Sequence, residues 1–440
     1  MQDSTRRKFL STLGIAAGAV AFAPKVHARA LGDIADAFKY REHLDPSELA
    51  KDEKFWSTVR AGFDLPKDIL NLDHGYCNPL SRVVADDLVG KARHLEQLPG
   101  KRLEELYADV TSKAVVPGLA RLLGVPSDEI ALTRNATEAL DTVILGLPMK
   151  AGDEIVCCSQ DYYAMLDAIE QREKRDGIVV RMVSPPMPAP SMDSIVDAYR
   201  KAIGPKTKLV LVTHASNLTG QIYPVKRIAE LAHRSGAEVL VDGAQTMALL
   251  DHKIPDLDCD YYGASLHKWL MAPVGSGVLW MRKQHVSKIW PIIPPPAGRE
   301  GMERFMWSGT YPEFISAAAG PAIAFHEKLG PALKEERARY LTSYWRPKAE
   351  TISGVKFYTS SAPEMSCGLG IFEIDGVDSG KFQQFLWDRH KILVQHMTGG
   401  KRSPKINGIR VTPNVYTTPG ELDRFVAVLK ANLENRDLKI

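Results

Sequence analysis

Residues 237–245 read Ala-Glu-Val-Leu-Val-Asp-Gly-Ala-Gln, and residues 261–269 read Tyr-Tyr-Gly-Ala-Ser-Leu-His-Lys-Trp. Each stretch is a short and mostly apolar run that ends in polar or charged side chains. Apolar runs of this length, followed by turn residues, are typical of buried strands. Asp242 and Lys268 therefore each follow the carboxyl end of a predicted strand.

Further apolar runs of the same kind lie on both sides of these two. Helix-length segments separate most of them, which is typical of parallel strands whose two faces are both covered. We therefore predict an α/β fold, with a mostly parallel sheet and helices on both of its faces. The additional runs are Glu154–Ser159, Ile178–Ser184, Lys208–Ala215 and Gly277–Met281.

The composition is that of a globular protein, with 440 residues of which 45% are hydrophobic and 25% charged. The net charge is +3, but residues 1–30 alone carry +4, so the rest of the chain sums to −1. A nucleic-acid partner is therefore not predicted. The five cysteines are odd in number and lack C-x-x-C spacing, so neither a metal site nor a disulfide framework is expected.

The N-terminus resembles a twin-arginine export signal. Residues 5–11 read Thr-Arg-Arg-Lys-Phe-Leu-Ser, an apolar run continues to Ala23, and Ala28-Arg29-Ala30 is similar to a small-residue cleavage site. The alternative is a basic amphipathic helix. The apolar run is too short to span a bilayer, so stable membrane insertion of the mature protein is not expected. This reading predicts a periplasmic protein whose partner during export is the twin-arginine translocon.

The chain changes character after the proline-rich stretch Pro291–Pro296. Helical periodicity near 317–328 and 331–345 precedes short predicted strands at 370–374 and 408–411 and a helix from Pro419. We predict an export signal at 1–30, an N-terminal segment at 31–85 that packs with the small domain, a large domain at 86–296 and a small α+β domain at 297–440.

Polar side chains follow several of the predicted strands, and ligands of open α/β sheets bind at that edge. They are Asn217, Asp242, Gln245, Ser265, His267 and Lys268. Upstream, Ala136 and Thr137 open a predicted helix whose N–H groups suit a phosphate, although Asn135 or Thr137 could simply cap it.

Together these parts suit pyridoxal 5′-phosphate (PLP). A lysine amine forms a Schiff base with the aldehyde of PLP, and an aspartate keeps the pyridine nitrogen protonated. Each residue also has a simpler explanation: Asp242 as a helix cap, Lys268 as a surface charge and Asn217 as a turn residue.

From about residue 70 to 430 the sequence resembles the class V family of fold type I, PLP-dependent aminotransferases. It is most similar to the branch that includes isopenicillin N epimerase-like proteins and cysteine desulfurases. With its signal it also resembles the exported PLP enzymes of pyoverdine maturation. The matching motifs are residues 71–76, 136–139, 213–217, 242–245, 265–268, 305–310 and 410–413.

The resemblance implies a fold type I protein with a smaller α+β domain and a role for each matched residue. Lys268 is the Schiff-base lysine and moves the proton at Cα, Asp242 pairs with the pyridine nitrogen, and Gln245 and Asn217 lie at the phenolic oxygen. The phosphate is surrounded by Ala136, Thr137, Ser265 and His267, with Thr310 reaching a phosphate across a homodimer interface.

The resemblance also implies residues that contact the ring and the substrate. Tyr162 stacks on the cofactor, with Tyr163 as second choice and a plain core tyrosine as the alternative. Arg410 binds a substrate carboxylate through its planar fork, unless it forms only a surface salt bridge. His74 and Tyr76 are predicted to contact the substrate as well.

A cysteine desulfurase needs a thiol nucleophile before the carboxylate-binding arginine, and residues 395–409 contain no cysteine. The remaining prediction is an aminotransferase or an epimerase that acts at Cα of a small-molecule or peptidyl amine with a carboxylate. A lyase, or an oxidative decarboxylation-type modification of a secreted peptide such as a siderophore precursor, is the alternative. A non-catalytic binding protein is less favoured, and a dehydrogenase lacks its G-x-G-x-x-G motif.

Overall fold

The computed structural model describes residues 45–434. The predicted export signal at 1–30 and the start of the predicted segment 31–85 lie outside these residues. Within the described part, no helix combines the length and the hydrophobicity that crossing a membrane requires.

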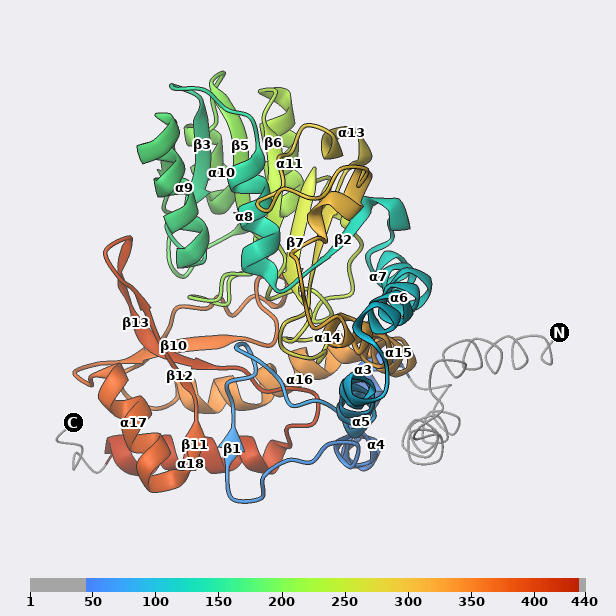
Figure 1. The fold of residues 1–440 in the computed structure, drawn as a ribbon. Coiled ribbons are helices and arrows are strands. Elements are labelled where there is room, and N and C mark those ends of the chain that lie inside the picture. The colour runs from blue at the N-terminus through green and yellow to red at the C-terminus, as the bar shows by residue number, and fades with distance from the viewer. Residues whose placement is uncertain (1–44, 435–440) are drawn as a thin grey trace.

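A seven-stranded sheet forms the larger half of the molecule, in the order β2-β8-β7-β6-β5-β3-β4 (Figure 1). β8 runs antiparallel to both of its neighbours, and the other adjacent pairs are parallel. This confirms the predicted mostly parallel sheet. The strands are β2 (Ile130–Thr133), β3 (Glu154–Cys158), β4 (Val179–Val183), β5 (Thr207–Thr213), β6 (Glu238–Asp242), β7 (Tyr261–Ser265) and β8 (Gly277–Met281).

Successive residues of these strands point to opposite faces of the sheet, and each face is covered by helices. Leu209 and Leu240 pack in one apolar cluster with α8 and α9, whereas Val210 and Val239 pack in another with α7, α10 and α11. Burying such side chains contributes about 1.5–3 kcal/mol each, which fixes the register of the strands. The covering helices are α7 (Val116–Leu123), α8 (Ala136–Gly146), α9 (Tyr163–Asp176), α10 (Met192–Ala202) and α11 (Val225–Arg234).

The C-terminal part contains a smaller antiparallel sheet in the order β12-β13-β10-β9. Its core is built around aromatic side chains, with Trp345 of α16 in contact with Phe372 of β10 and Phe425 of α18. The predicted small α+β architecture is therefore present. Its elements are α16 (Pro331–Glu350), β9 (Val355–Phe357), β10 (Gly370–Ile374), α17 (Ser379–His390), β11 (Ile392–Leu393), β12 (Gln395–Gly399), β13 (Ser403–Val411) and α18 (Pro419–Glu434).

The N-terminal part of the described chain packs on the C-terminal core. β1 (Leu70–Asn71) pairs in parallel with β11, and Leu70 and Leu72 belong to the same apolar cluster as Trp345. Arg337 of α16 pairs with Glu53 of α4. The domain boundaries given above stay predictions.

The remaining helices surround these two sheets. They are α3 (Pro46–Leu49), α4 (Glu53–Arg60), α5 (Arg82–Arg93), α6 (Gly100–Val110), the π-helical turn Thr111–Val115, α12 (Ile254–Leu257), α13 (Lys283–Val286), α14 (Phe314–Ala317), α15 (Ala319–Leu329) and the 3₁₀ turns His94–Glu96, Ser127–Glu129, Gly301–Phe305 and Pro363–Met365.

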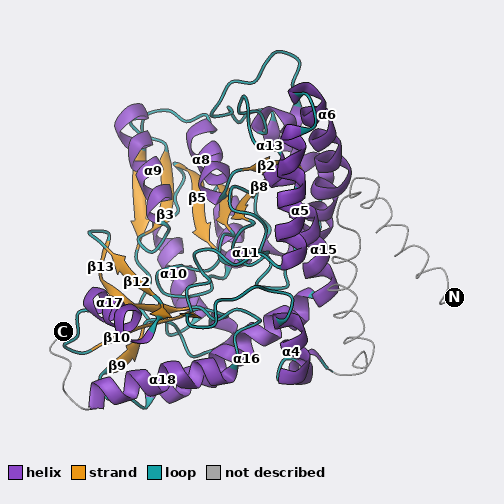
Figure 2. Ribbon diagram, turned by 60° about the horizontal axis from the view of Figure 1, so that its bottom comes forward, coloured by secondary structure: helices purple, strands orange, loops and turns teal. Residues whose placement is uncertain are grey.

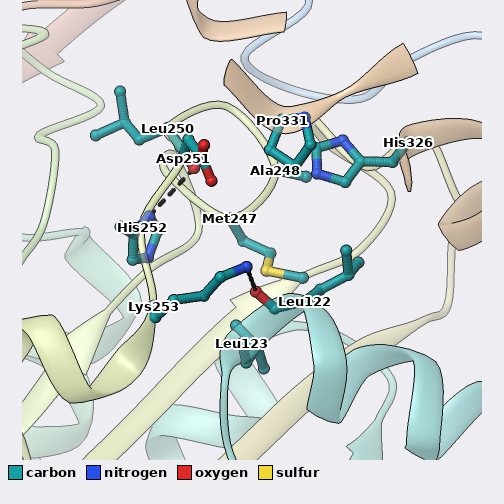
Figure 3. A pocket seen from close by; sticks show the side chains of 10 residues that line it. All are labelled: Leu122, Leu123, Met247, Ala248, Leu250, Asp251, His252, Lys253, His326 and Pro331. Carbon is teal, nitrogen blue, oxygen red and sulfur yellow. Dashed lines mark hydrogen bonds between the residues drawn. The ribbon is translucent and has the colours of Figure 1, made fainter. Parts of the chain in front are cut away.

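The carboxyl ends of the parallel strands point toward the smaller sheet (Figure 2). The polar residues that follow those strands are therefore placed between the two parts of the molecule. A small pocket lies elsewhere, between the end of α7 and the loop after β6, where Lys253 donates to the carbonyl of Leu122 at 2.8 Å (Figure 3). This pocket contains none of the predicted site residues.

Candidate active site

Lys268 and Asp242 lie at the carboxyl edge of two neighbouring strands. Asp242 is the last residue of β6, and Lys268 follows β7 after Leu266 and His267. The Asp242 side chain is 6% exposed, and its Oδ1 accepts a hydrogen bond of 2.9 Å from the N–H of Ala244. A buried carboxylate is thus presented at the sheet edge from which the lysine also projects.

The two side chains act on each other electrostatically. Burial lowers the pKa of the Lys268 amine, and the net value is about 8. Of the nearby charges, Asp242 and Asp73 oppose this decrease, whereas Arg410 adds to it. Burial raises the pKa of Asp242, and Lys268 and the N–H of Ala244 oppose that rise. Lys268 is therefore not the plain surface charge of the simpler explanation, since its amine is desolvated and coupled to a carboxylate.

The N-terminus of α8 has features that suit an anion. Asn135 caps the helix, because its Oδ1 accepts from the N–H of Glu138 at 3.0 Å. The N–H of Ala136 donates to Oγ of Ser265 at 2.9 Å. The N–H of Thr137 forms no hydrogen bond within residues 45–434. Asn135 is therefore a helix cap, as the simpler explanation had it. The free N–H of Thr137 lies at the positive end of the helix dipole, a position that suits a phosphate.

His267 offers a second unsatisfied polar group. Its Nδ1 is buried and has no hydrogen-bond partner among the described residues. Burial and the charge of Lys268 lower the pKa of the imidazole to about 4, so the ring is neutral at physiological pH. Buried polar atoms are normally paired, so an orphan of this kind is what a bound polar ligand satisfies.

Gln245 connects the sheet edge to the N-terminal segment. Its Nε2 donates to the carbonyl of Gly75 at 2.9 Å, and its Oε1 accepts from the indole N–H of Trp269 at 3.1 Å. Asn217, the other amide predicted at the phenolic oxygen, is half-buried in the turn after β5.

Arg410 is buried on β13, and its guanidinium is already engaged in part. Its Nη2 donates to Oδ1 of Asp73 at 2.8 Å, whereas its Nε is buried without a partner among the described residues. A Cβ atom on Gly75 would lie 3.1 Å from Cζ of Arg410, so glycine lets the main chain approach the guanidinium closely. The surface salt bridge considered above does not apply, because Arg410 is 3% exposed.

Three tyrosines border this region. The hydroxyl of Tyr162 donates to that of Tyr163 at 3.3 Å, and their ring centroids are 4.5 Å apart. Burial raises the pKa of Tyr162, and the nearby Tyr163, Tyr76 and Asp242 raise it further. Tyr162 is therefore close enough to Asp242 to interact with it electrostatically, and its place over the cofactor stays a prediction. Tyr163 and Tyr76 are 62% and 70% exposed.

The structure places the other predicted residues differently. His74 is buried against Tyr416, whose hydroxyl lies 3.2 Å from its Nδ1, and burial lowers the pKa of His74 to about 3. Thr310 is exposed in the loop before α14. Its predicted partner is a second protomer, so its role stays a prediction.

Sequence reasoning missed three buried polar residues next to the site. Asp73 pairs with Arg410, Asn78 binds the carbonyl of Lys268, and Lys334 binds the carbonyl of Trp269. Asp73 belongs to the motif at residues 71–76, but the sequence assigned no role to it. Nothing in the sequence around Asn78 or Lys334 indicates that either residue lies at the site. A lysine on a helix is normally solvated, and the sequence does not show that α16 buries this one.

The residues present fit PLP. They supply a desolvated lysine amine, a buried carboxylate beside it, and two atoms that are unpaired among the described residues, the N–H of Thr137 at the start of α8 and Nδ1 of His267. Within residues 45–434, no cluster of three or more His, Cys, Asp or Glu side chains could hold a metal ion. Fold and site together define a fold type I, PLP-dependent enzyme.

The comparisons with known proteins agree with this class. Residues 112–425 match the model of the family Aminotransferase class-V. The isopenicillin N epimerase of Amycolatopsis lactamdurans is 30% identical over 400 residues, which cover 85% of this chain and 98% of that protein. The isopenicillin N epimerase of Streptomyces clavuligerus is 29% identical over 396 residues, which cover 86% of this chain and 98% of that protein.

Relatives with another name and solved structures also match. A probable cysteine desulfurase of Halalkalibacterium halodurans is 32% identical over 57% of this chain and 63% of that protein. The apo cysteine desulfurase of Thermococcus onnurineus NA1 superposes with a TM-score of 0.77 at 22% identity, covering 86% and 98% of the two chains. A C-DES mutant with glycine covalently linked to the PLP cofactor gives 0.73 at 22% identity, covering 84% and 98%. The chain belongs to the class V aminotransferase family, and its cofactor is PLP.

Proposed function

We propose that this protein acts at the α-carbon of an amino-acid or peptidyl substrate that carries a carboxylate, as an aminotransferase or an isopenicillin N epimerase-like epimerase. The observation that carries the proposal is the Lys268 amine, whose pKa burial lowers to about 8 beside the buried Asp242 and within the field of Arg410. The similarity to two isopenicillin N epimerases over 98% of their length supports it.

Each of these side chains has a task in such a reaction. When bound, PLP supplies an electron sink that stabilises negative charge at Cα. Lys268 is the base that removes the Cα proton, because a pKa near neutrality suits an amine that must both accept and release a proton. The negative charge of the Asp242 carboxylate lies near the Lys268 amine, where it would favour the protonated form of the pyridine nitrogen of PLP.

Arg410 holds the substrate carboxylate. Its Nη2 is bound to Asp73, while its buried Nε has no partner in the part of the chain that the structure describes and is left to donate to the substrate. Aminotransfer and epimerisation share the loss of the Cα proton, and they differ in the atom and the face to which a proton returns.

A cysteine desulfurase activity is disfavoured by the thiols. The stretch 395–409 forms the β12–β13 hairpin and has no cysteine. Burial raises the pKa of the Cys77 thiol, which Asp73 raises further, and burial raises the pKa of Cys367 to about 12. A nucleophilic thiolate requires the opposite shift.

The alternative outcome is a lyase or an oxidative decarboxylation-type modification of a secreted peptide such as a siderophore precursor. Tyr76 and Tyr163 favour a substrate longer than a free amino acid, since both rings are strongly exposed beside the site.

The test is incubation of the holoenzyme in D₂O with a panel of amino acids that includes L-glutamate, and with peptides that carry them. Released keto acid together with conversion of the cofactor to pyridoxamine phosphate establishes aminotransfer, whereas deuterated substrate of inverted configuration establishes epimerisation. Release of CO₂ or of a β-substituent identifies the alternative. Absence of all four products, or a protein that cannot be loaded with PLP, would overturn the proposal.

Export and assembly belong to the same proposal. We place the mature protein in the periplasm, delivered by the twin-arginine translocon, and we propose a homodimer in which Thr310 of one protomer reaches the phosphate of the other. Sedimentation of the holoenzyme measures the oligomeric state, and a monomer that binds PLP fully would contradict this role of Thr310.

A further inference from the structure

We propose that Asn78 and Lys334 are positioning residues that hold the main chain around Lys268 and so fix where its amine is presented. The inference rests on Lys268 being the lysine that attaches the cofactor. Its basis is a set of hydrogen bonds to three consecutive carbonyl groups, those of His267, Lys268 and Trp269.

Asn78 binds the first two of these carbonyls. Its N–H donates to the carbonyl of His267 at 3.1 Å, and its Nδ2 donates to the carbonyl of Lys268 at 2.7 Å. The second hydrogen of Nδ2 goes to the carbonyl of His74 at 2.9 Å. The carbonyl of Lys268 also accepts from the N–H of Met271 at 3.1 Å, so both of its lone pairs are occupied.

The oxygen of the Asn78 amide is tied to the C-terminal part of the chain. Oδ1 accepts from Nδ2 of Asn414 and, at 3.1 Å, from the hydroxyl of Tyr416. All four hydrogen-bonding positions of the amide are therefore filled, and the side chain is 7% exposed. An amide with every position filled has one orientation. Asn78 therefore links Asn414 and Tyr416 by hydrogen bonds to the main chain at Lys268, so that their positions constrain the position of that main chain.

Lys334 binds the third carbonyl. It lies on α16, is 1% exposed, and its Nζ donates to the carbonyl of Trp269. Burial lowers the pKa of its amine to about 7, and no ion pair with a carboxylate is formed within residues 45–434. A buried lysine without a counter-ion destabilises a fold. We therefore attribute the role of Lys334 to its hydrogen bond with the carbonyl of Trp269.

Clamping three successive carbonyls restricts the φ and ψ angles of Lys268 and thereby the origin of its side chain. Catalytic groups have to be held within about 0.5 Å of their working position, and a displacement of about 1 Å can cost a hundredfold in rate. Loss of either clamp should therefore slow covalent capture of PLP by Lys268 without removing any group that contacts PLP.

The experiment measures this capture directly. Apoenzyme is mixed with PLP, the linkage is fixed with borohydride at timed intervals, and the peptide that contains Lys268 is quantified by mass spectrometry. We expect Lys334→Met and Asn78→Leu each to slow capture by about tenfold to a hundredfold. Lys334→Met removes the buried charge at nearly constant volume, so its melting temperature should stay close to that of the parent.

Gln221→Met is the matched control. Gln221 is a buried amide whose Nε2 donates to the carbonyls of Ile222 and Met365 at 2.8 and 3.2 Å, away from the Lys268 main chain. Its loss removes comparable bonds, and capture should keep the parental rate. If Lys334→Met captures PLP as fast as the parent and the control, the positioning role is wrong even where Asn78→Leu fails to fold.

Lys268→Ala separates this inference from the proposed function. If PLP is still fixed to the chain in that variant, the assignment of Lys268 fails and the clamp loses its purpose. A second outcome is that Lys268→Ala abolishes capture of PLP, whereas a folded Asn78→Leu variant and Lys334→Met both capture it at the parental rate. In that case the assignment of Lys268 stands and only the positioning role is refuted.

Discussion

Replacing Asp242 by asparagine should lower the pKa of Lys268 in the apoenzyme. The net pKa of Lys268 is about 8 instead of 10.5, because desolvation lowers it, and Asp242 is the largest contribution that opposes the decrease. Asparagine keeps the shape and removes the negative charge, so the protonated amine loses its main stabilising partner. An opposite charge at close range shifts a pKa by about 1–3 units, and one unit corresponds to about 1.4 kcal/mol.

The consequence for reactivity follows from the neutral fraction of the amine. With a pKa of about 8, roughly one tenth of the Lys268 amines are neutral at pH 7, compared with roughly one in three thousand for a solvated lysine. A decrease of one unit in Asp242→Asn raises the neutral fraction at pH 7 to about one half. The variant should therefore react about fivefold faster at that pH.

Competitive labelling measures this pKa without cofactor or substrate. Apoenzyme is treated with trace acetic anhydride between pH 5 and 11, with free lysine as internal standard, and the Lys268 peptide is quantified. Asp73→Asn should lower the midpoint less than Asp242→Asn, and Arg410→Met should raise it. A midpoint that stays unchanged or rises in Asp242→Asn would refute the electrostatic coupling on which the site is built.

Arg410→Leu should raise KM for carboxylate substrates by about tenfold to two-hundredfold, as expected for a lost charged hydrogen bond, with little change for the corresponding amides; equal losses for both would show that Arg410 does not bind the carboxylate. Asn135→Ala should cost about 1 kcal/mol of stability, measured by denaturant unfolding, because the N–H of Glu138 loses its cap; an unchanged midpoint would remove Asn135 as a cap. Arg6→Lys combined with Arg7→Lys should keep the protein in the cytoplasm, as fractionation would show, and normal export would exclude the twin-arginine route.

Most of the large sheet was predictable from sequence because its strands are short apolar runs that end in polar residues. The strand that was not predicted, β2, has only four residues and continues directly into Arg134 and Asn135. Its place beside β8 depends on long-range pairing, with Ile130 opposite Trp280. Nothing in four consecutive residues specifies such a partner.

The site was predictable where a residue directly follows a strand and unpredictable where burial is tertiary. Asp242 and Lys268 are placed by the ends of β6 and β7, which the apolar pattern locates. Asp73, Asn78 and Lys334 reach the same place from a loop and from α16. Their contacts exist only after the two halves of the molecule have packed together.

The parallel pairing of β1 with β11 has a consequence for the order in which the molecule is completed. Leu70 is paired with Ile392, a residue synthesised about 320 positions later. At roughly 5–20 residues per second, a ribosome needs about 15–60 s to supply that partner, and Leu70 and Leu72 stay without their final contacts until then. The segment around β1 is thus made early, and its packing is completed only when nearly the whole chain has been synthesised.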